Sequence, residues 1–172
     1  MQLAAVIAAL ESMPGALQRR LEGLTDAQLR FKPGADVFSV LESVWHLRDI
    51  EVEGYSVRLQ RLMAEEQPRL PDLDGSRLAV VRRYNTLPLL AALDGFISTR
   101  RANLKLLRSV SEAQLGRHGH LDTVGHISLG RLLELWVEHD RGHIKELDEL
   151  LALLRDPRTG RASSPSPSLS AS

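Results

Sequence analysis

Apolar residues recur near a helical period from the start of the chain. In the first stretch they are Leu3, Val6, Ile7, Leu10, Leu17, Leu21 and Leu24. A spacing near 3.6 residues predicts an amphipathic helix with one buried face. Pro14 and Gly15 interrupt this stretch, so we expect a break or kink between two helical pieces.

Three short motifs indicate where further helices begin. The segments Thr25–Gln28, Ser39–Glu42 and Ser111–Gln114 each carry the Ser/Thr-x-x-Glu/Gln pattern of a capping box. The first and the third each predict a short helical turn. The second predicts a strong helix that runs to about Glu66 and is stopped by Pro68.

The second half of the chain predicts two more long helices. The predicted segments are a short helix Arg77–Tyr84, a long helix Thr86–Ser109, a loop Gly116–Gly125 and a long helix from Leu129 to about Asp156. Pro88 lies in the first turn of the Thr86 helix, where a missing N–H costs nothing, and Ser128 is expected to cap the last helix. Four long helices without an alternating strand pattern predict an all-α fold, a four-helix bundle of the up-and-down type with short extra helices.

The composition changes near the C-terminus. Residues 157–172 are rich in Ser and Pro and offer almost nothing to bury, so we expect a flexible tail there. Residues 1–156 are expected to form one bundle domain. A chain of 172 residues is long enough to bury a core without disulfides or a structural metal.

Charge and cysteine content exclude several classes of protein. Lys+Arg and Asp+Glu both number 22, so the net charge is zero and the chain lacks the basic footprint of a nucleic-acid binder. The absence of Cys removes disulfides, thiolate metal sites and a cysteine nucleophile, and suits a cytoplasmic protein. No apolar run approaches the roughly 20 residues of a membrane span. The apolar start also has no basic residue before Arg19, unlike a secretory signal.

The last predicted helix carries two histidines one turn apart. His139 and His143, at i and i+4, lie on one helix face with Cβ atoms about 5–6 Å apart, so both imidazoles can reach one ion. They fall between the two halves of the apolar stripe of this helix. Unpartnered ring nitrogens are unfavourable there, and a metal ion would satisfy both rings. The alternative is a pair of solvated histidines on the helix surface.

A metal site needs a third ligand, and His46 is the best candidate. It lies at the edge of the apolar stripe of the Ser39 helix, 93 residues before His139, so only packing of the bundle could bring it close. Three neutral imidazoles would leave one coordination position open, which is typical of a catalytic rather than a structural zinc site. Taken alone, His46 would be interpreted as a hydrogen-bonded core histidine.

Three acidic residues near these histidines have two interpretations each. Asp49 and Glu53 either face the site or are ordinary exposed acids. Asp140 is either a helix-surface charge or a hydrogen-bond partner of a ligand imidazole. The segment His139–His143 also resembles the zincin helix motif. The protease mechanism needs a Glu where this chain has the shorter Asp140, so we do not expect a metalloprotease.

The roles of five further residues stay open. Trp45 and Trp136 each lie within one turn of a proposed ligand and either pack in the core or also form a wall of a substrate cavity. His118, His120 and His126 lie in or beside the predicted loop before the last helix, and no role is assigned to them.

Six stretches of sequence, taken in their order along the chain, point to one family. They are Phe38–Glu51, Arg58, Tyr84, Phe96–Arg100, Gly125–Gly130 and Glu138–His143. With them the chain resembles the DinB/YfiT-like superfamily over about residues 1–155. The resemblance implies a four-helix bundle that holds a divalent ion through three residues, usually His. The matching positions are His46, His139 and His143.

The resemblance also implies a class of activity. It suggests a metal-dependent enzyme with a small-molecule substrate, either a hydrolase or an S-transferase that uses a low-molecular-weight thiol of the bacillithiol or mycothiol type. Zinc is the expected ion, and nickel, iron and manganese stay open because imidazole is not selective. Relatives in this superfamily are often homodimers, so we expect one here. The alternative is a non-catalytic metal-binding module that serves dimerisation or interaction in a stress response.

Overall fold

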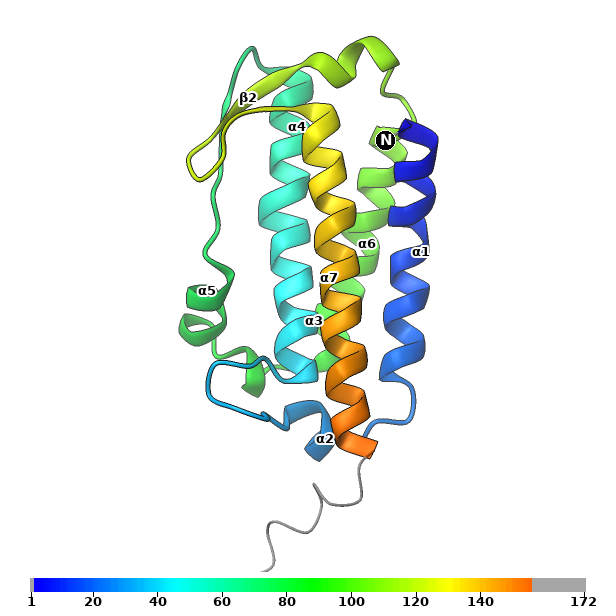
Figure 1. Cartoon of the computed structure of the whole chain (residues 1–172), viewed down its shortest axis with the longest axis vertical. Helices are drawn as coiled ribbons and strands as arrows, with labels where there is room; N and C mark the ends of the chain where they lie inside the picture. The colour runs from blue at the N-terminus through cyan, green and yellow to red at the C-terminus, as the bar shows by residue number, and fades with distance from the viewer. Residues whose placement is uncertain (1, 156–172) are drawn as a thin grey trace, which may run out of the picture.

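Four helical rods lie side by side in the computed structural model, which describes residues 2–155 (Figure 1). The rods are α1 (Leu3–Leu21), α3 (Val40–Asp49) continued by η1 (Ile50–Tyr55) and α4 (Ser56–Ala64), α6 (Leu89–Leu107) and α7 (Leu129–Arg155). The predicted all-α four-helix bundle is confirmed. The predicted tail, residues 157–172, lies outside the described residues. No helix among residues 2–155 is long and apolar enough to cross a membrane.

The first helix, α1, continues through Pro14 as one element, so the predicted break into two helical pieces is wrong. Proline lacks an N–H, which deprives the carbonyl of Leu10 of its helical partner. That carbonyl accepts a hydrogen bond of 2.9 Å from Nη1 of the buried Arg100 on α6 instead. The lost helical bond is therefore replaced by one that ties α1 to a neighbouring rod.

The second rod begins where the capping box predicts. Oγ of Ser39 accepts from the backbone N–H of Glu42 at 3.1 Å, and Oε2 of Glu42 accepts from the backbone N–H of Ser39 at 2.9 Å. The rod ends at Ala64, two residues before the predicted end. Its middle, η1, is a π-helical segment, which was not expected from the sequence pattern. Such segments are rare and frequently lie at functional sites.

The long connection from α4 to α6 determines the direction in which α6 runs. It contains β1 (Arg69–Leu70), α5 (Gly75–Val81) and η2 (Tyr84–Thr86). It returns the chain to the end of the bundle where α3 begins, since Oγ of Ser39 donates to Oδ1 of Asn85 at 2.7 Å. The rods α3–α4 and α6 therefore run parallel (Figure 1), and the predicted up-and-down order is wrong.

Three of the other predicted helix starts agree with the structure, whereas α5 begins two residues before the predicted Arg77 and α6 three residues after the predicted Thr86. The boxes that begin at Thr25 and Ser111 open α2 (Asp26–Arg30) and the short helix η3 (Glu112–Gly116). Oγ of Ser128 accepts from the backbone N–H of Arg131 at 3.1 Å and so caps α7. Pro88 is the N-cap residue of α6 rather than a member of its first turn.

The predicted loop Gly116–Gly125 contains part of a small sheet. The strand β2 (His118–Leu121) pairs antiparallel with β3 (Gly125–Ser128) and parallel with β1. Gly119 lets β2 approach the connecting chain, because a Cβ at this position would lie 2.6 Å from the carbonyl oxygen of Pro68. This sheet pins the start of the α4–α6 connection to the end of the bundle.

A polar layer crosses the middle of the bundle. Two clusters of buried apolar side chains fill the interior on either side of it, one around Trp136 and Leu59, the other around Phe96 and Leu47. The buried polar residues between them are Glu51, Arg100, Asn103 and Asp140. Burial of a polar group costs free energy unless the group is paired, so we expect each residue of this layer to have hydrogen-bond or charge partners.

Candidate metal centre

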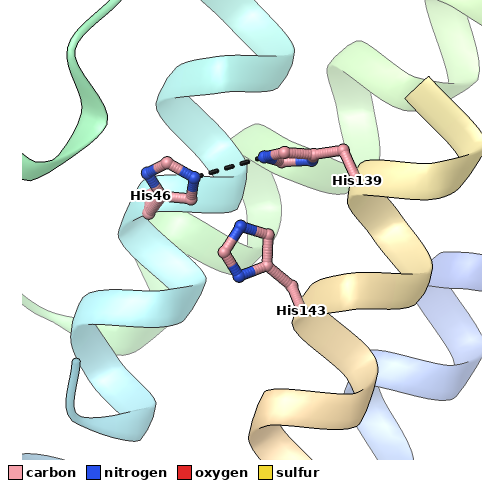
Figure 2. Close-up of side chains that lie close together, drawn as sticks. All are labelled: His46, His139 and His143. Atoms are coloured by element: carbon pink, nitrogen blue, oxygen red, sulfur yellow. Dashed lines mark hydrogen bonds between the residues drawn. The ribbon is translucent and has the colours of Figure 1, made fainter. Parts of the chain in front are cut away.

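The three predicted ligands come together beside the polar layer. His46 projects from α3, and His139 and His143 project from successive turns of α7, so that the rings face one another between the two rods (Figure 2). One nitrogen from each ring lies within 4.8 Å of the others. The distance between Nε2 of His46 and Nε2 of His139 is 3.2 Å. Two segments 93 residues apart thus meet at one point, as the sequence analysis expected.

Burial keeps the rings of His46 and His143 uncharged near neutral pH. The side chains of His139 and His143 are 23% and 14% exposed. Burial, with a smaller effect of the neighbouring His139 ring, lowers the pKa of His46 to about 4 and that of His143 to about 3. A neutral imidazole offers a lone pair, which is the form that binds a metal ion.

The spacing of the ring nitrogens also fits a cation. Two nitrogen ligands of a tetrahedral zinc ion, each about 2.0–2.1 Å from the metal, lie about 3.3 Å apart, close to the His46–His139 distance. Nδ1 of each of the three rings is buried without a hydrogen bond. Nδ1 of His143 lies 2.8 Å from Oε2 of Glu146, but the two are not aligned for a hydrogen bond.

Behind His139, the polar layer forms a buried ion-pair network. Arg100 donates from Nε and Nη2 to Glu51, at 2.9 and 2.8 Å, and from Nη1 to Asp140 at 2.7 Å. Asn103 and Trp136 add hydrogen bonds to Glu51 at 2.9 and 3.0 Å. Two carboxylates against one guanidinium leave a formal charge of −1, which favours a cation nearby.

This network corrects the expectation for Asp140, and its other members were not predicted from the sequence. Asp140 is 5% exposed, so its interpretation as a surface charge is wrong. Its Oδ1 lies 3.9 Å from Nδ1 of His139, too far for the alternative hydrogen bond to a ligand. Burial alone would raise the pKa of Asp140, but His139 and Arg100 hold it below its ordinary value. Arg100 could have been noticed from its spacing, since it follows Phe96 and precedes Leu104 on the buried stripe of α6.

Asp49 belongs to a second network, at the end of the α4–α6 connection. It is 1% exposed and accepts hydrogen bonds from Tyr84 and Arg48, at 2.5 and 2.7 Å, and one from Arg82. These partners overcome the effect of burial and lower the pKa of its carboxyl group. Glu53 accepts two hydrogen bonds from Arg82, at 2.6 and 2.9 Å. Both acids thus anchor the connecting chain, and Asp49 is not exposed.

A cleft of about 600 Å³ opens onto two of the histidines, His46 and His143. This volume lies within the range of small-molecule sites. Gly75, the first residue of α5, lies against the His46 ring, because an added Cβ would be 2.3 Å from Cε1 of His46. The connecting chain therefore forms one wall of the cleft and packs on a proposed ligand.

The remaining aromatic and histidine candidates do not line this cleft. Trp136 is fully buried and stacks on Tyr55 at 4.6 Å between ring centroids. Trp45 stacks on Tyr84 at 6.1 Å, so both tryptophans pack within the fold. The three histidines left without a role lie in the hairpin strands β2 and β3, away from the cleft: His118, His120 and His126.

Two bacterial proteins are similar in sequence to this chain over most of its length. The chain is 30% identical over 151 residues to the Bacillus subtilis protein described as "Putative metal-dependent hydrolase YfiT", covering 84% of this chain and 81% of YfiT. It is 25% identical over 141 residues to OB0782 of Oceanobacillus iheyensis, which carries the same description, covering 82% of this chain and 81% of OB0782.

Two solved structures resemble the described fold. The structure of YfiT superimposes with a TM-score of 0.82 at 27% identity, covering 89% of this chain and 87% of YfiT. A mycothiol-dependent maleylpyruvate isomerase superimposes with a TM-score of 0.65 at 14% identity, covering 86% of this chain and 61% of the isomerase. The second likeness shows a shared fold alone. The profile of the DinB superfamily matches residues 9–147, and the chain therefore belongs to that superfamily.

Proposed function

We propose that this protein is a metal-dependent enzyme, a hydrolase of a small molecule, with His46, His139 and His143 as the ligands of one divalent ion. The observation that carries the proposal is the convergence of three imidazoles beside a cleft that opens onto two of them, His46 and His143. Zinc is the expected ion, and nickel, iron and manganese are alternatives because imidazole ligands do not discriminate strongly.

A divalent ion in this position would supply Lewis acidity, which would lower the pKa of a water or thiol nucleophile toward neutrality. The protein's own residues prepare the position. Arg100, held between Glu51 and Asp140, ties the turn of α7 that carries His139 to η1 and α6. Gly75 leaves room for the His46 ring at the wall of the cleft. The cleft admits the substrate beside His46 and His143.

Two nucleophiles are compatible with this site. Hydrolysis is supported by the shared description of YfiT and OB0782 as metal-dependent hydrolases. Transfer of a low-molecular-weight thiol is the second candidate, and it is supported by the fold shared with a mycothiol-dependent isomerase. The chain contains no Cys, so a thiol would have to arrive with a cosubstrate.

Metal content tests the ligand set directly. Protein purified without an affinity tag, loaded with Zn²⁺ and freed of excess metal, is expected to retain about one ion per chain by elemental analysis. Replacing His46, His139 or His143 by Ala should reduce this to a small fraction, because two imidazoles make a weak site. His126→Ala is the matched control, since His126 is exposed on β3 and should leave the metal content unchanged.

Activity is then measured against panels of esters and amides, with and without a thiol cosubstrate. Turnover that a chelator and His143→Ala both abolish supports the enzyme, and its dependence on the thiol separates the two nucleophiles. Full metal content in all three histidine variants would exclude the proposed site.

A further inference from the structure

The cleft in front of the proposed metal ligands has an acidic lining. Its charged side chains, among the described residues that line it, are Asp36, Glu146 and Glu149. Lys145, which does not line the cleft, lies 3.7 Å from Glu149 and compensates part of the negative charge of the lining. Asp36 and Glu146 have no ion pair with a Lys or Arg among the described residues.

The acids come from two separate elements and face the same opening. Asp36 lies in the loop between α2 and α3, and Glu146 lies one turn beyond His143 on α7. Glu146 approaches the ligand ring closely, with Oε2 2.8 Å from Nδ1 of His143. A substrate that reaches the ligands therefore passes within a few ångströms of a carboxylate. Between these acids the walls are apolar, at Phe38 and Leu150.

We propose that the cleft selects substrates that carry a cationic amine or guanidinium group next to the reacting end. This inference rests on the proposed function, because the reacting end is the part that reaches the metal ligands. The acidic lining attracts a positive group and repels a carboxylate or phosphate placed at the same distance, and it opposes the charge of the divalent ion, which acts in the other direction. The acidic side chains determine which substrates bind, and they take no part in the breaking or forming of bonds.

Charged thiols test this selectivity without a known substrate. Protein loaded with Co²⁺ is titrated with cysteamine, which is cationic, with 2-mercaptoethanol, which is neutral, and with 3-mercaptopropionate, which is anionic. Binding is followed through the visible spectrum of the cobalt site. The thiols differ in intrinsic acidity, so the measured quantity is the ratio of the cysteamine affinity to the 3-mercaptopropionate affinity, compared between variants.

In the double variant Asp36→Asn/Glu146→Gln this ratio is expected to fall about tenfold at low salt, because two charges that act oppositely on the two thiols are removed. Glu138→Gln is the matched control, since Glu138 lies on α7, is paired with Arg131 and does not line the cleft. All three substituted side chains are exposed, so folding is expected to be preserved.

The outcomes separate the two proposals. If Co²⁺ binds at about one ion per chain, is lost in His143→Ala, and the ratio is the same in the double variant as in the unmodified protein, the charge selectivity is overturned and the metal site stands. Failure to bind Co²⁺, or binding that His143→Ala does not weaken, overturns both proposals. A drop of the ratio in Glu138→Gln equal to that in the double variant also overturns the selectivity, because it would show no dependence on the cleft.

Discussion

Gly75 has no side chain, and this absence leaves room for the ring of His46, one of the proposed ligands. Its Cα lies so close to the His46 ring that a Cβ would stand 2.3 Å from Cε1 and 2.5 Å from Nδ1. Gly75→Ala must therefore displace either the ring or the start of α5. We expect the affinity for Zn²⁺ to fall at least tenfold, since a ligand shifted by a few tenths of an ångström loses its alignment. Competition with a chromophoric chelator measures this affinity.

Gly142 provides the control for that substitution. It lies on α7 between His139 and His143, the two proposed ligands on this helix, and a Cβ there would meet nothing within 4 Å. Gly142→Ala is expected to keep the Zn²⁺ affinity and to raise the free energy of unfolding by up to about 1 kcal/mol, because Ala favours the helix. Equal Zn²⁺ affinities in the two variants would contradict the proposed role of Gly75.

The residues of the site differ in how far the sequence revealed them. The i and i+4 spacing and the interrupted apolar stripe pointed to His139 and His143, and the resemblance to a family supported His46. Gly75 could not be found in this way, because it acts through the absence of atoms against a ring far away in the chain. Glu51 was missed because an acid on a long helix is ordinarily exposed, and its partner Arg100 is 49 residues away.

At the scale of elements, the close approach of β2 to the α4–α6 connection can be tested. Gly119→Ala places a Cβ 2.6 Å from the carbonyl oxygen of Pro68, a backbone atom that cannot rotate away. We expect a loss of about 1–3 kcal/mol in the free energy of unfolding, from urea denaturation. Gly116→Ala is the control, since nothing lies within 4 Å of its Cβ. A difference of less than about 0.5 kcal/mol between the two variants would contradict this account.

Elements with a strong local signal were predicted, and elements set by tertiary contacts were not. The capping boxes at Thr25, Ser39 and Ser111 satisfy backbone groups within one turn, so the local sequence defines them. The strands of the hairpin have four residues each and contain glycine, too short and irregular to show alternation. The π-helical segment Ile50–Tyr55 has no local sequence signature, and its residues Glu51 and Tyr55 form hydrogen bonds to α6 and α7, far away in the chain.

At the scale of the whole molecule, Arg100 joins all four rods of the bundle. Its guanidinium contacts Leu10 on α1, Glu51 on η1 and Asp140 on α7. Arg100→Leu would leave two buried carboxylates without a counter-charge, and we expect a loss of about 3–5 kcal/mol in the free energy of unfolding.

Arg108 is the matched control for this change. It pairs with Glu11 in an ion pair whose side chains are 51% and 58% exposed, so Arg108→Leu should cost less than about 1 kcal/mol. Equal losses in the two variants, measured by urea denaturation in the same buffer, would contradict the role of the buried network.

The buried histidines predict how stability depends on pH. In the metal-free protein the folded pKa values of His46 and His143, about 4 and about 3, lie below the unfolded value near 6.5. The unfolded chain therefore binds more protons below pH 6.5, and the folded state loses stability as the pH falls. Between pH 7 and pH 5 we expect a loss of about 2–4 kcal/mol.

Urea denaturation with a chelator present checks this dependence. The double variant His46→Ala/His143→Ala should show a shallower slope over the same range, because the two groups that exclude protons are gone. A free energy of unfolding that is constant from pH 7 to pH 5 in the unmodified protein would refute the expectation.

The proline within the first helix couples the residue types that are expected at two distant positions of the chain. Pro14 frees one carbonyl, and the side chain at position 100 takes it up. Among homologous chains, those with an apolar residue at the position of Arg100 have nothing to donate to that carbonyl, and an ordinary helix former at the position of Pro14 would then be favoured. The two positions are therefore expected to vary together over evolution, although 86 residues separate them.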